Sequence, residues 1–170
     1  MERTFGRSKR GTRIITRLKH RSQRYTLIGA MGLGGMKAPW LIGRGMSQKD
    51  FLKYLKEHLI PVLPAGTTVV WDNLNIHKSD EVQELMKEAG LVGICQSRYS
   101  PDFNPIEKAW SKIKTLVRGK RPRGAKELRA AVSWAWEQIT LKDIRGYFKH
   151  CGLLLHQDSP ISIEVQKLAV

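Results

Sequence analysis

Cysteine and long apolar runs are scarce in this sequence of 170 residues. Its two cysteines, Cys95 and Cys151, lie far apart and neither belongs to a Cys-x-x-Cys pair, which excludes a disulfide framework and a cysteine-based zinc site. The chain has no run of about 18 apolar residues and no apolar stretch behind its charged N-terminus, so neither a membrane span nor a secretion signal is predicted. We therefore expect a protein of the cytoplasm, a reducing compartment.

Acidic residues are also in short supply. The chain has 30 lysines and arginines against 15 aspartates and glutamates, a net charge of +15. Residues 1–24 hold nine basic side chains and one acidic one, and residues 111–126 hold seven basic side chains and no acidic one; these two segments account for the whole excess. Such concentrated charge favours a polyanionic partner, because each neutralised phosphate releases counterions. The simpler alternative is a solvated tail and a solubilising helix face.

Apolar periodicity and turn residues predict an α/β domain with a mixed sheet. The first two strands are expected to form a hairpin across the glycine-rich turn 32–35, and the later strands alternate with helices. Ser47, Ser79 and Thr140 are the expected caps of three helices. The apolar strands 67–71 and 91–95 are typical of buried strands. The expected strands are 25–31, 38–42, 67–71 and 91–95, and the expected helices begin near residues 47, 79, 105, 125 and 141.

The first stretch that suggests chemistry is residues 71–78, Trp-Asp-Asn-Leu-Asn-Ile-His-Lys. Here an apolar strand ends on a carboxylate, Asp72, and ligands of open α/β sheets bind at the carboxyl ends of the strands. The alternative is that Asp72 and Asn73 are turn residues that supply local hydrogen bonds.

The second stretch is residues 99–107, Tyr-Ser-Pro-Asp-Phe-Asn-Pro-Ile-Glu. Asn104 fits an N-cap, Pro105 the first helical position and Glu107 the third, which is a capping-box pattern and a complete structural explanation of Glu107. That explanation does not account for residues 100–105, Ser-Pro-Asp-Phe-Asn-Pro, whose prolines hold the chain extended before the helix. This rigid segment indicates that the start of the helix must lie at a defined position.

Asp72 and Glu107 have 34 residues between them, enough for one helix, one strand and a loop. We therefore expect both carboxylates at one edge of the sheet, where they can bind hard divalent cations such as Mg²⁺. Beyond Glu107, basic residues follow at helical spacing and predict a track for the DNA backbone. The expected DNA-contacting residues are Lys112, Lys114, Arg118, Lys120, Arg121 and Arg123, with Arg7, Arg10 and Arg13 in the N-terminal segment.

These residues resemble the catalytic domain of insertion-sequence transposases of the mariner-like superfamily, a group of DDE superfamily endonucleases whose metal ligands are two aspartates and a glutamate or a third aspartate. The most specific matches are the Asp-Asn-x-x-x-His-Lys and Tyr-Ser-Pro-Asp-x-Asn-Pro-Ile-Glu phrases, and the interval between them also matches. The matching segments are residues 6–11, 27–31, 71–78, 99–107 and 147–152.

The resemblance implies a ribonuclease-H-like fold and a Mg²⁺-dependent enzyme, with Mn²⁺ as an alternative ion, that cuts and rejoins double-stranded DNA. It implies that the intact enzyme acts as a homodimer or larger assembly. Asp72 takes the family's second acidic position and Glu107 the third. Asn73 and His77 match residues beside the metals: Asn73 is expected to orient Asp72, and His77 has either a structural or a functional role.

The chain departs from the family at its N-terminus. The family's first acidic ligand lies on the first, central strand, upstream of the phrase that here begins at Gly6, and Glu2 lies in a basic stretch unsuited to replace it. We therefore expect a truncated domain that lacks this strand, is inactive alone and leaves neighbouring strand edges unpaired. The expected divisions are a basic lead-in at 1–23, a partial catalytic domain at 24–152 and a weakly ordered tail at 153–170.

Three alternatives remain at this point. The first is a non-enzymatic, basic DNA-binding remnant of a transposase. The second is a cellular nuclease of the same fold, such as a ribonuclease H or a resolvase, which the Tyr-Ser-Pro-Asp phrase disfavours. The third is a plain structural α/β protein, for which the charge clusters and both specific phrases would be coincidences.

Overall fold

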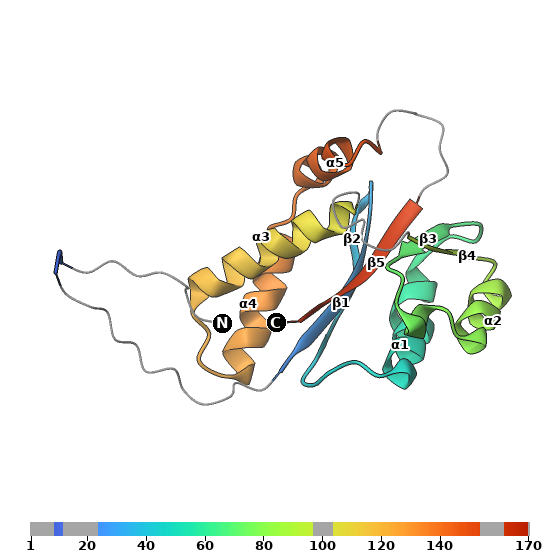
Figure 1. The fold of residues 1–170 in the computed structure, drawn as a ribbon, viewed down its shortest axis with the longest axis horizontal. Coiled ribbons are helices and arrows are strands. Elements are labelled where there is room, and N and C mark those ends of the chain that lie inside the picture. The colour runs from blue at the N-terminus through green and yellow to red at the C-terminus, as the bar shows by residue number, and fades with distance from the viewer. Residues whose placement is uncertain (1–8, 12–23, 97–103, 154–161, 170) are drawn as a thin grey trace.

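A computed structural model of the protein describes residues 9–11, 24–96, 104–153 and, for the backbone alone, 162–169. Five strands form one mixed sheet with helices on both faces (Figure 1), as the α/β prediction requires. The strands are β1 (Thr26–Gly32), β2 (Gly35–Ile42), β3 (Thr68–Trp71), β4 (Val92–Cys95) and β5 (Ser162–Ala169). The helices are α1 (Gln48–Tyr54), α2 (Asp80–Glu88), α3 (Pro105–Lys120), α4 (Ala125–Glu137) and α5 (Leu141–His150).

The strand order in the sheet is β2-β1-β5-β3-β4. The predicted hairpin is present: β1 pairs antiparallel with β2 across a turn in which Gly35 has φ +132°, a conformation that glycine adopts without a steric penalty. β3 and β4 are parallel, with Thr68 beside Val92 and Trp71 beside Cys95. This parallel pair places the carboxyl ends of both strands at one edge of the sheet.

The strand β5 corrects two expectations. It lies between β1 and β3, antiparallel to the first and parallel to the second, so these strands do not have the unpaired edges that we expected. Residues 162–169 are a strand of the sheet and not part of a weakly ordered tail. The alternation of Ile163 and Val165 with polar residues suits a strand, but its partners are distant in sequence, and periodicity alone does not reveal such a pairing.

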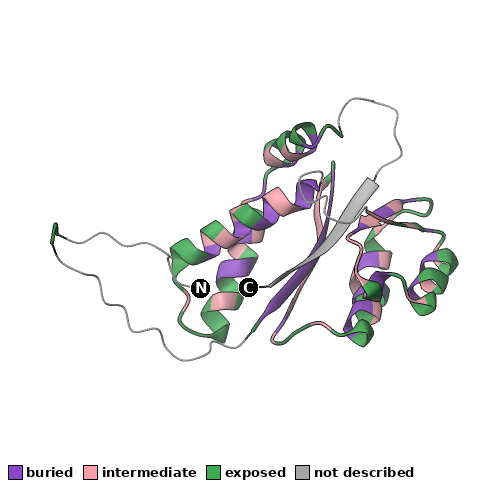
Figure 2. Ribbon diagram, viewed as in Figure 1, coloured by how far each residue is buried: buried purple, intermediate pink, exposed green. Residues whose placement is uncertain are grey.

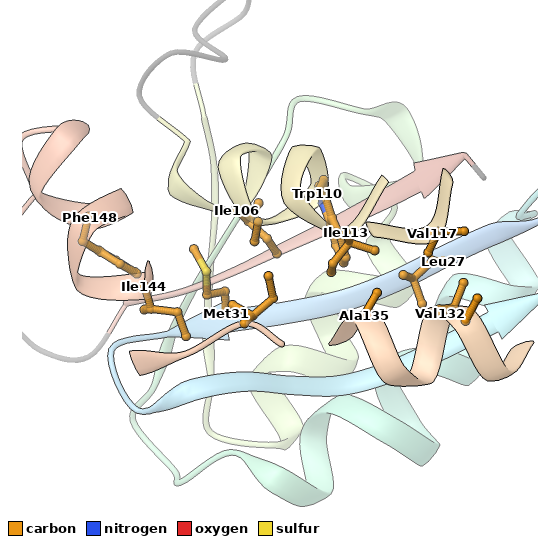
Figure 3. Close-up of a cluster of buried hydrophobic side chains, with 13 residues drawn as sticks. Leu27, Met31, Ile106, Trp110, Ile113, Val117, Val132, Ala135, Ile144 and Phe148 are labelled. Atoms are coloured by element: carbon orange, nitrogen blue, oxygen red, sulfur yellow. The ribbon is translucent and has the colours of Figure 1, made fainter. Parts of the chain in front are cut away.

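Two apolar cores cover the two faces of the sheet. Figure 3 shows the first, in which side chains of α3, α4 and α5 pack on Leu27 and Met31 of β1. The second joins Ile28 and Ala30 of β1 to α1, α2 and β3. Every residue of β1 is buried (Figure 2), because helices cover the strand on both sides.

The helix starts follow the sequence with one exception. Ser47 caps α1 and Thr140 caps α5, each in a capping box with an acidic residue at the third helical position. Ser79 precedes α2 as predicted, but its hydroxyl makes no capping hydrogen bond. After Tyr54, the first helix continues through a π-helical turn, η1 (Leu55–Leu59), and a 3₁₀ turn, η2 (Ile60–Val62).

The strand β4 is more exposed than its apolar sequence predicts. Val92 is 52% exposed and Ile94 is 48% exposed, because β4 is an edge strand of the sheet. On its other face, Gly93 lies against Trp71: a Cβ atom at this glycine would be 2.6 Å from the indole ring. Among the described residues, no helix has both the length and the apolar character that crossing a membrane requires.

Gly29 offers a test of the packing between β1 and α4. A Cβ atom at this position would lie 2.3 Å from the ring of Trp136, whereas a Cβ atom at Gly34 would meet nothing within 4 Å. We expect Gly29→Ala to lower the free energy of unfolding by about 1–3 kcal/mol through overpacking. Urea denaturation measures this change, with Gly34→Ala as the matched control. Equal stability of the two variants would contradict the packing described for the tryptophans.

Candidate metal and nucleic-acid site

Asp72 follows the last residue of β3 and is held by a buried histidine. His77, in the short 3₁₀ turn η3 (Asn75–His77), is 2% exposed, and its ring lies 4.5 Å from that of Phe51 and 5.4 Å from that of Trp71. Its Nδ1 atom is 2.9 Å from the backbone oxygen of Asp72 and 2.9 Å from the Oδ1 atom of the same residue. His77 therefore fastens the Asp72 turn to the core.

Two side-chain oxygens in this turn have no hydrogen-bond donor. His77 Nδ1 is hydrogen-bonded to the carbonyl of Asp72, and the buried Oδ1 atoms of Asp72 and Asn73 have no hydrogen-bond partner. Buried oxygens without a donor are uncommon and call for an explanation. Both are hard oxygen donors of the kind that Mg²⁺ and Mn²⁺ bind, so the residues present fit a divalent cation.

A chain of hydrogen bonds joins the end of β3 to the start of α3. The backbone N–H of Gln96 donates to the carbonyl of Trp71 at 2.8 Å. The side chain of Asn104 donates to Oε1 of Gln96 at 3.1 Å, and Oδ1 of Asn104 accepts from the N–H of Ile106 at 3.2 Å. The predicted N-cap role of Asn104 is therefore confirmed, and this cap also ties the helix to the edge of the sheet where Asp72 lies.

Glu107, the third residue of α3, is partly buried one position beyond this chain of hydrogen bonds. The rest of the specific phrase before it, residues 97–103, lies outside the described residues. In the parts of the chain that the structure describes, no three His, Cys, Asp or Glu side chains are grouped so that they could hold a metal ion.

The residues of the predicted basic row on α3 lie in different surroundings. Lys114 is partly exposed and Arg118 is exposed, and both follow Glu107 at helical spacing. Lys112 lies elsewhere on the helix, where its Nζ atom is 2.7 Å from Oδ2 of Asp143. This ion pair and the Thr140 cap lower the pKa of Asp143 to about 2. The positive charge of Lys112 therefore faces a carboxylate at the start of α5.

The remaining predicted contacts lie at the turn between α3 and α4. Lys120 has its Nζ atom 4.1 Å from the ring centre of Trp134. Arg121 ends α3 in a left-handed conformation, with φ 51°, and the backbone N–H of Arg123 donates to Glu127 at 2.7 Å. The exposed residues of this basic corner are Arg118, Lys120, Arg121, Arg123 and Lys126. In the N-terminal segment, Arg10 is exposed, while Arg7 and Arg13 lie outside the described residues.

The sequence did not reveal the role of Gln96. This residue is the first after β4 and joins Trp71 to Asn104, so it sets where α3 begins relative to the sheet. The sequence did offer one indication of this role, because Gln96 directly follows an apolar strand. Polar residues at the carboxyl ends of strands are candidates for ligand-binding sites.

Comparisons with known proteins bear directly on this arrangement. Residues 1–129 match the family model described as DDE superfamily endonuclease. The chain belongs to this family. The match includes β3 with Asp72 and the start of α3 with Glu107, so both candidate carboxylates of this DDE endonuclease family member lie within it.

One relative is the "Insertion element IS630 uncharacterized 39 kDa protein" of Shigella sonnei, which is 33% identical over 107 residues. The aligned region covers 62% of this chain and 31% of the relative. The chain therefore spans about a third of the length of the curated relative that it matches.

Proposed function

We propose that this DDE family member carries part of the active site of a transposase of the mariner-like superfamily, with Asp72 and Glu107 as ligands to Mg²⁺ or Mn²⁺. The observation that supports this most directly is the hydrogen-bond chain from Trp71 through Gln96 to Asn104, because it joins the two residues' elements at one sheet edge. Bound ions of this kind activate water and stabilise the charge that develops on a phosphodiester during cleavage.

The protein's own residues supply orientation in this proposal. His77 holds the carbonyl of Asp72 and stays in the aromatic core, where it acts as a positioning residue. Asn73 adds a second donor-free oxygen beside Asp72, and we assign it to orienting or supplementing the cation site. The hydrogen bond from Asn104 to Gln96 ties the start of the helix that carries Glu107 to the end of β4, and a metal site needs such support because small displacements of ligands weaken binding.

The proposed substrate is double-stranded DNA, at the ends of an insertion element and at its target. Lys114 and Arg118 extend from the Glu107 end of α3 toward the basic corner, which offers the duplex a continuous series of phosphate contacts. A dimer or larger assembly would hold two DNA ends, so that a freed 3′-hydroxyl can attack target DNA.

The described residues provide two carboxylates of the three that the family uses, and no cluster of three. We propose that this polypeptide alone does not cleave DNA. The same observation favours the second candidate function, a basic DNA-binding remnant without turnover. The two candidates differ in ion binding: a preserved site binds Mn²⁺ through Asp72, whereas a remnant with a decayed site does not.

The test is a titration of the full chain with Mn²⁺, followed by electron paramagnetic resonance. We expect Asp72→Asn to reduce Mn²⁺ affinity at least about 10-fold, because replacing a charged ligand with an amide weakens binding of a hard cation. Asp80→Asn is the matched control, since Asp80 is an exposed acid at the start of α2. Equal Mn²⁺ affinity in both variants would refute the assignment of Asp72.

A further inference from the structure

Trp134 of α4 differs from the other tryptophans of the chain in what its ring contacts. Each of the other four lies beside a further aromatic ring; they are Trp40, Trp71, Trp110 and Trp136. Within the described residues, the ring of Trp134 has a cation as its partner instead, because the Nζ atom of Lys120 lies 4.1 Å from the ring centre.

We propose that the Trp134 ring and the basic corner together bind an unpaired nucleotide of DNA. The base stacks on the ring, and the basic corner binds the neighbouring phosphates. This inference rests on the proposed function, because it names a class of DNA end that the same basic surface receives.

The group over the Trp134 ring is the end of an exposed, flexible side chain. Lys120 is the last residue of α3 and is exposed, while Trp134 is only partly buried. The ring also packs against the core formed with α3 and α5, which holds it in one place. Cation–π contacts at exposed sites are weak, so Lys120 can leave the ring for a phosphate while a base takes its position.

The basic corner places positive charge next to this ring. α3 and α4 lie side by side (Figure 1), and the turn between them carries part of the corner. Residues 118–129 hold six basic side chains and one acidic side chain. That acid, Glu127, accepts a hydrogen bond from the backbone N–H of Arg123. An aromatic ring on a positively charged surface is the combination with which proteins bind unpaired nucleotides, through base stacking and phosphate contacts.

The position of Trp134 favours an unpaired base over a paired one. In a duplex, the bases stack on one another and a protein reaches only their edges in the grooves. An unpaired nucleotide leaves the face of its base free for an aromatic ring. α3 rises about 20 Å between Glu107 and Lys120, so this site is separate from the candidate cation site, and duplex DNA along α3 can place an unpaired extension at the corner.

The experiment compares two labelled probes by fluorescence anisotropy, a blunt duplex and the same duplex with an unpaired extension of four thymidines. We expect Trp134→Leu to weaken binding of the extended duplex about 10-fold and to leave binding of the blunt duplex unchanged. Trp134→Phe, which keeps an aromatic ring, is expected to retain most of the affinity. Trp40→Leu is the matched control, since Trp40 is a partly buried tryptophan of the other core, and we expect it to bind both probes normally.

Equal losses on the two probes would overturn the inference, because the ring would then only support the fold or the basic surface. A second measurement needs no variant. It compares the wild-type affinity for the extended duplex with that for a duplex whose extension consists of four abasic sites, which keep the phosphates and lack the bases. We expect the abasic extension to bind about 10-fold more weakly, and equal affinity would also overturn the inference.

The proposed function fails or stands by a different measurement. If the abasic and thymidine extensions bind equally while Mn²⁺ affinity still depends on Asp72, the inference falls and the proposed function stands. If the thymidine extension is preferred while Asp72→Asn binds Mn²⁺ normally, the nucleotide site stands and the cation assignment falls. A wild-type chain that binds neither DNA nor Mn²⁺ would overturn both.

Discussion

The substitution Val165→Pro is expected to unfold the protein or to lower its free energy of unfolding by about 3 kcal/mol or more. β5 has a neighbouring strand on each side, and Val165 pairs with Ala30 of β1 and with Trp71 of β3. Proline has no N–H and a fixed φ, which makes it unsuited to a central strand. The loss of stability is expected to exceed that of a single hydrogen bond. β1 and β3 do not pair with each other, so the sheet is continuous only through β5.

Guanidinium denaturation followed by circular dichroism measures this effect. Val165→Thr is the control, since threonine keeps the branched shape and the N–H group at the same position. We expect the threonine variant to unfold cooperatively and to remain more stable than the proline variant, with a moderate loss caused by the added hydroxyl. A proline variant as stable as the threonine variant would show that β5 is not a central strand of the folded protein.

Removal of three basic residues along α3 and its following turn is expected to weaken DNA binding on the order of 100-fold at about 50 mM salt. The variant is Lys114→Ala, Arg118→Ala and Arg123→Ala combined. Each lost phosphate contact reduces the slope of log affinity against log salt by about 0.9, since fewer counterions are released. The three positions continue from the Glu107 end of α3 into the basic corner.

Fluorescence anisotropy with a labelled duplex, repeated over a range of salt concentrations, gives both the affinity and the slope. The control replaces Lys49, Lys56 and Lys87, three exposed lysines of the α1 and α2 side, and has the same loss of charge. We expect this control to bind nearly as the wild type does. Equal losses in the two triple variants would show that net charge, and not the α3 surface, determines the affinity for DNA.

Local sequence signals were sufficient for most of the helices and strands. The glycine turn between β1 and β2, the capping boxes at Ser47 and Thr140, and the Asn104-Pro105 helix start all occur where the residues predict them. Each of these features depends on residues a few positions apart, which is why a sequence read locally reveals them. Ser79 is the exception, because a helix can begin after a serine without using its hydroxyl as a cap.

Local sequence signals did not predict the burial of a strand or the partner of a charged side chain where these depend on residues far apart in the sequence. The sequence of β4 is apolar enough for a buried strand, yet its place at the edge of the sheet leaves Val92 and Ile94 half exposed. Lys112 has the same chemical character as Lys114, yet the position of α5 gives it Asp143 as a partner. Neither relation follows from periodicity, because both depend on how separate elements pack.

The candidate site divides in the same way. The sequence by itself determined the basic segments, the family phrases around Asp72 and Glu107, and the hairpin and helices that carry them, because these depend on residue chemistry and short-range spacing. Only the tertiary structure decided that Gln96 links β3 to α3, that His77 is buried against Asp72, and that residues 162–169 are the middle strand. The pairing of β5 with β1 and β3 joins residues that are far apart in the sequence. Such long-range pairing depends on which strand edges the rest of the fold leaves unpaired.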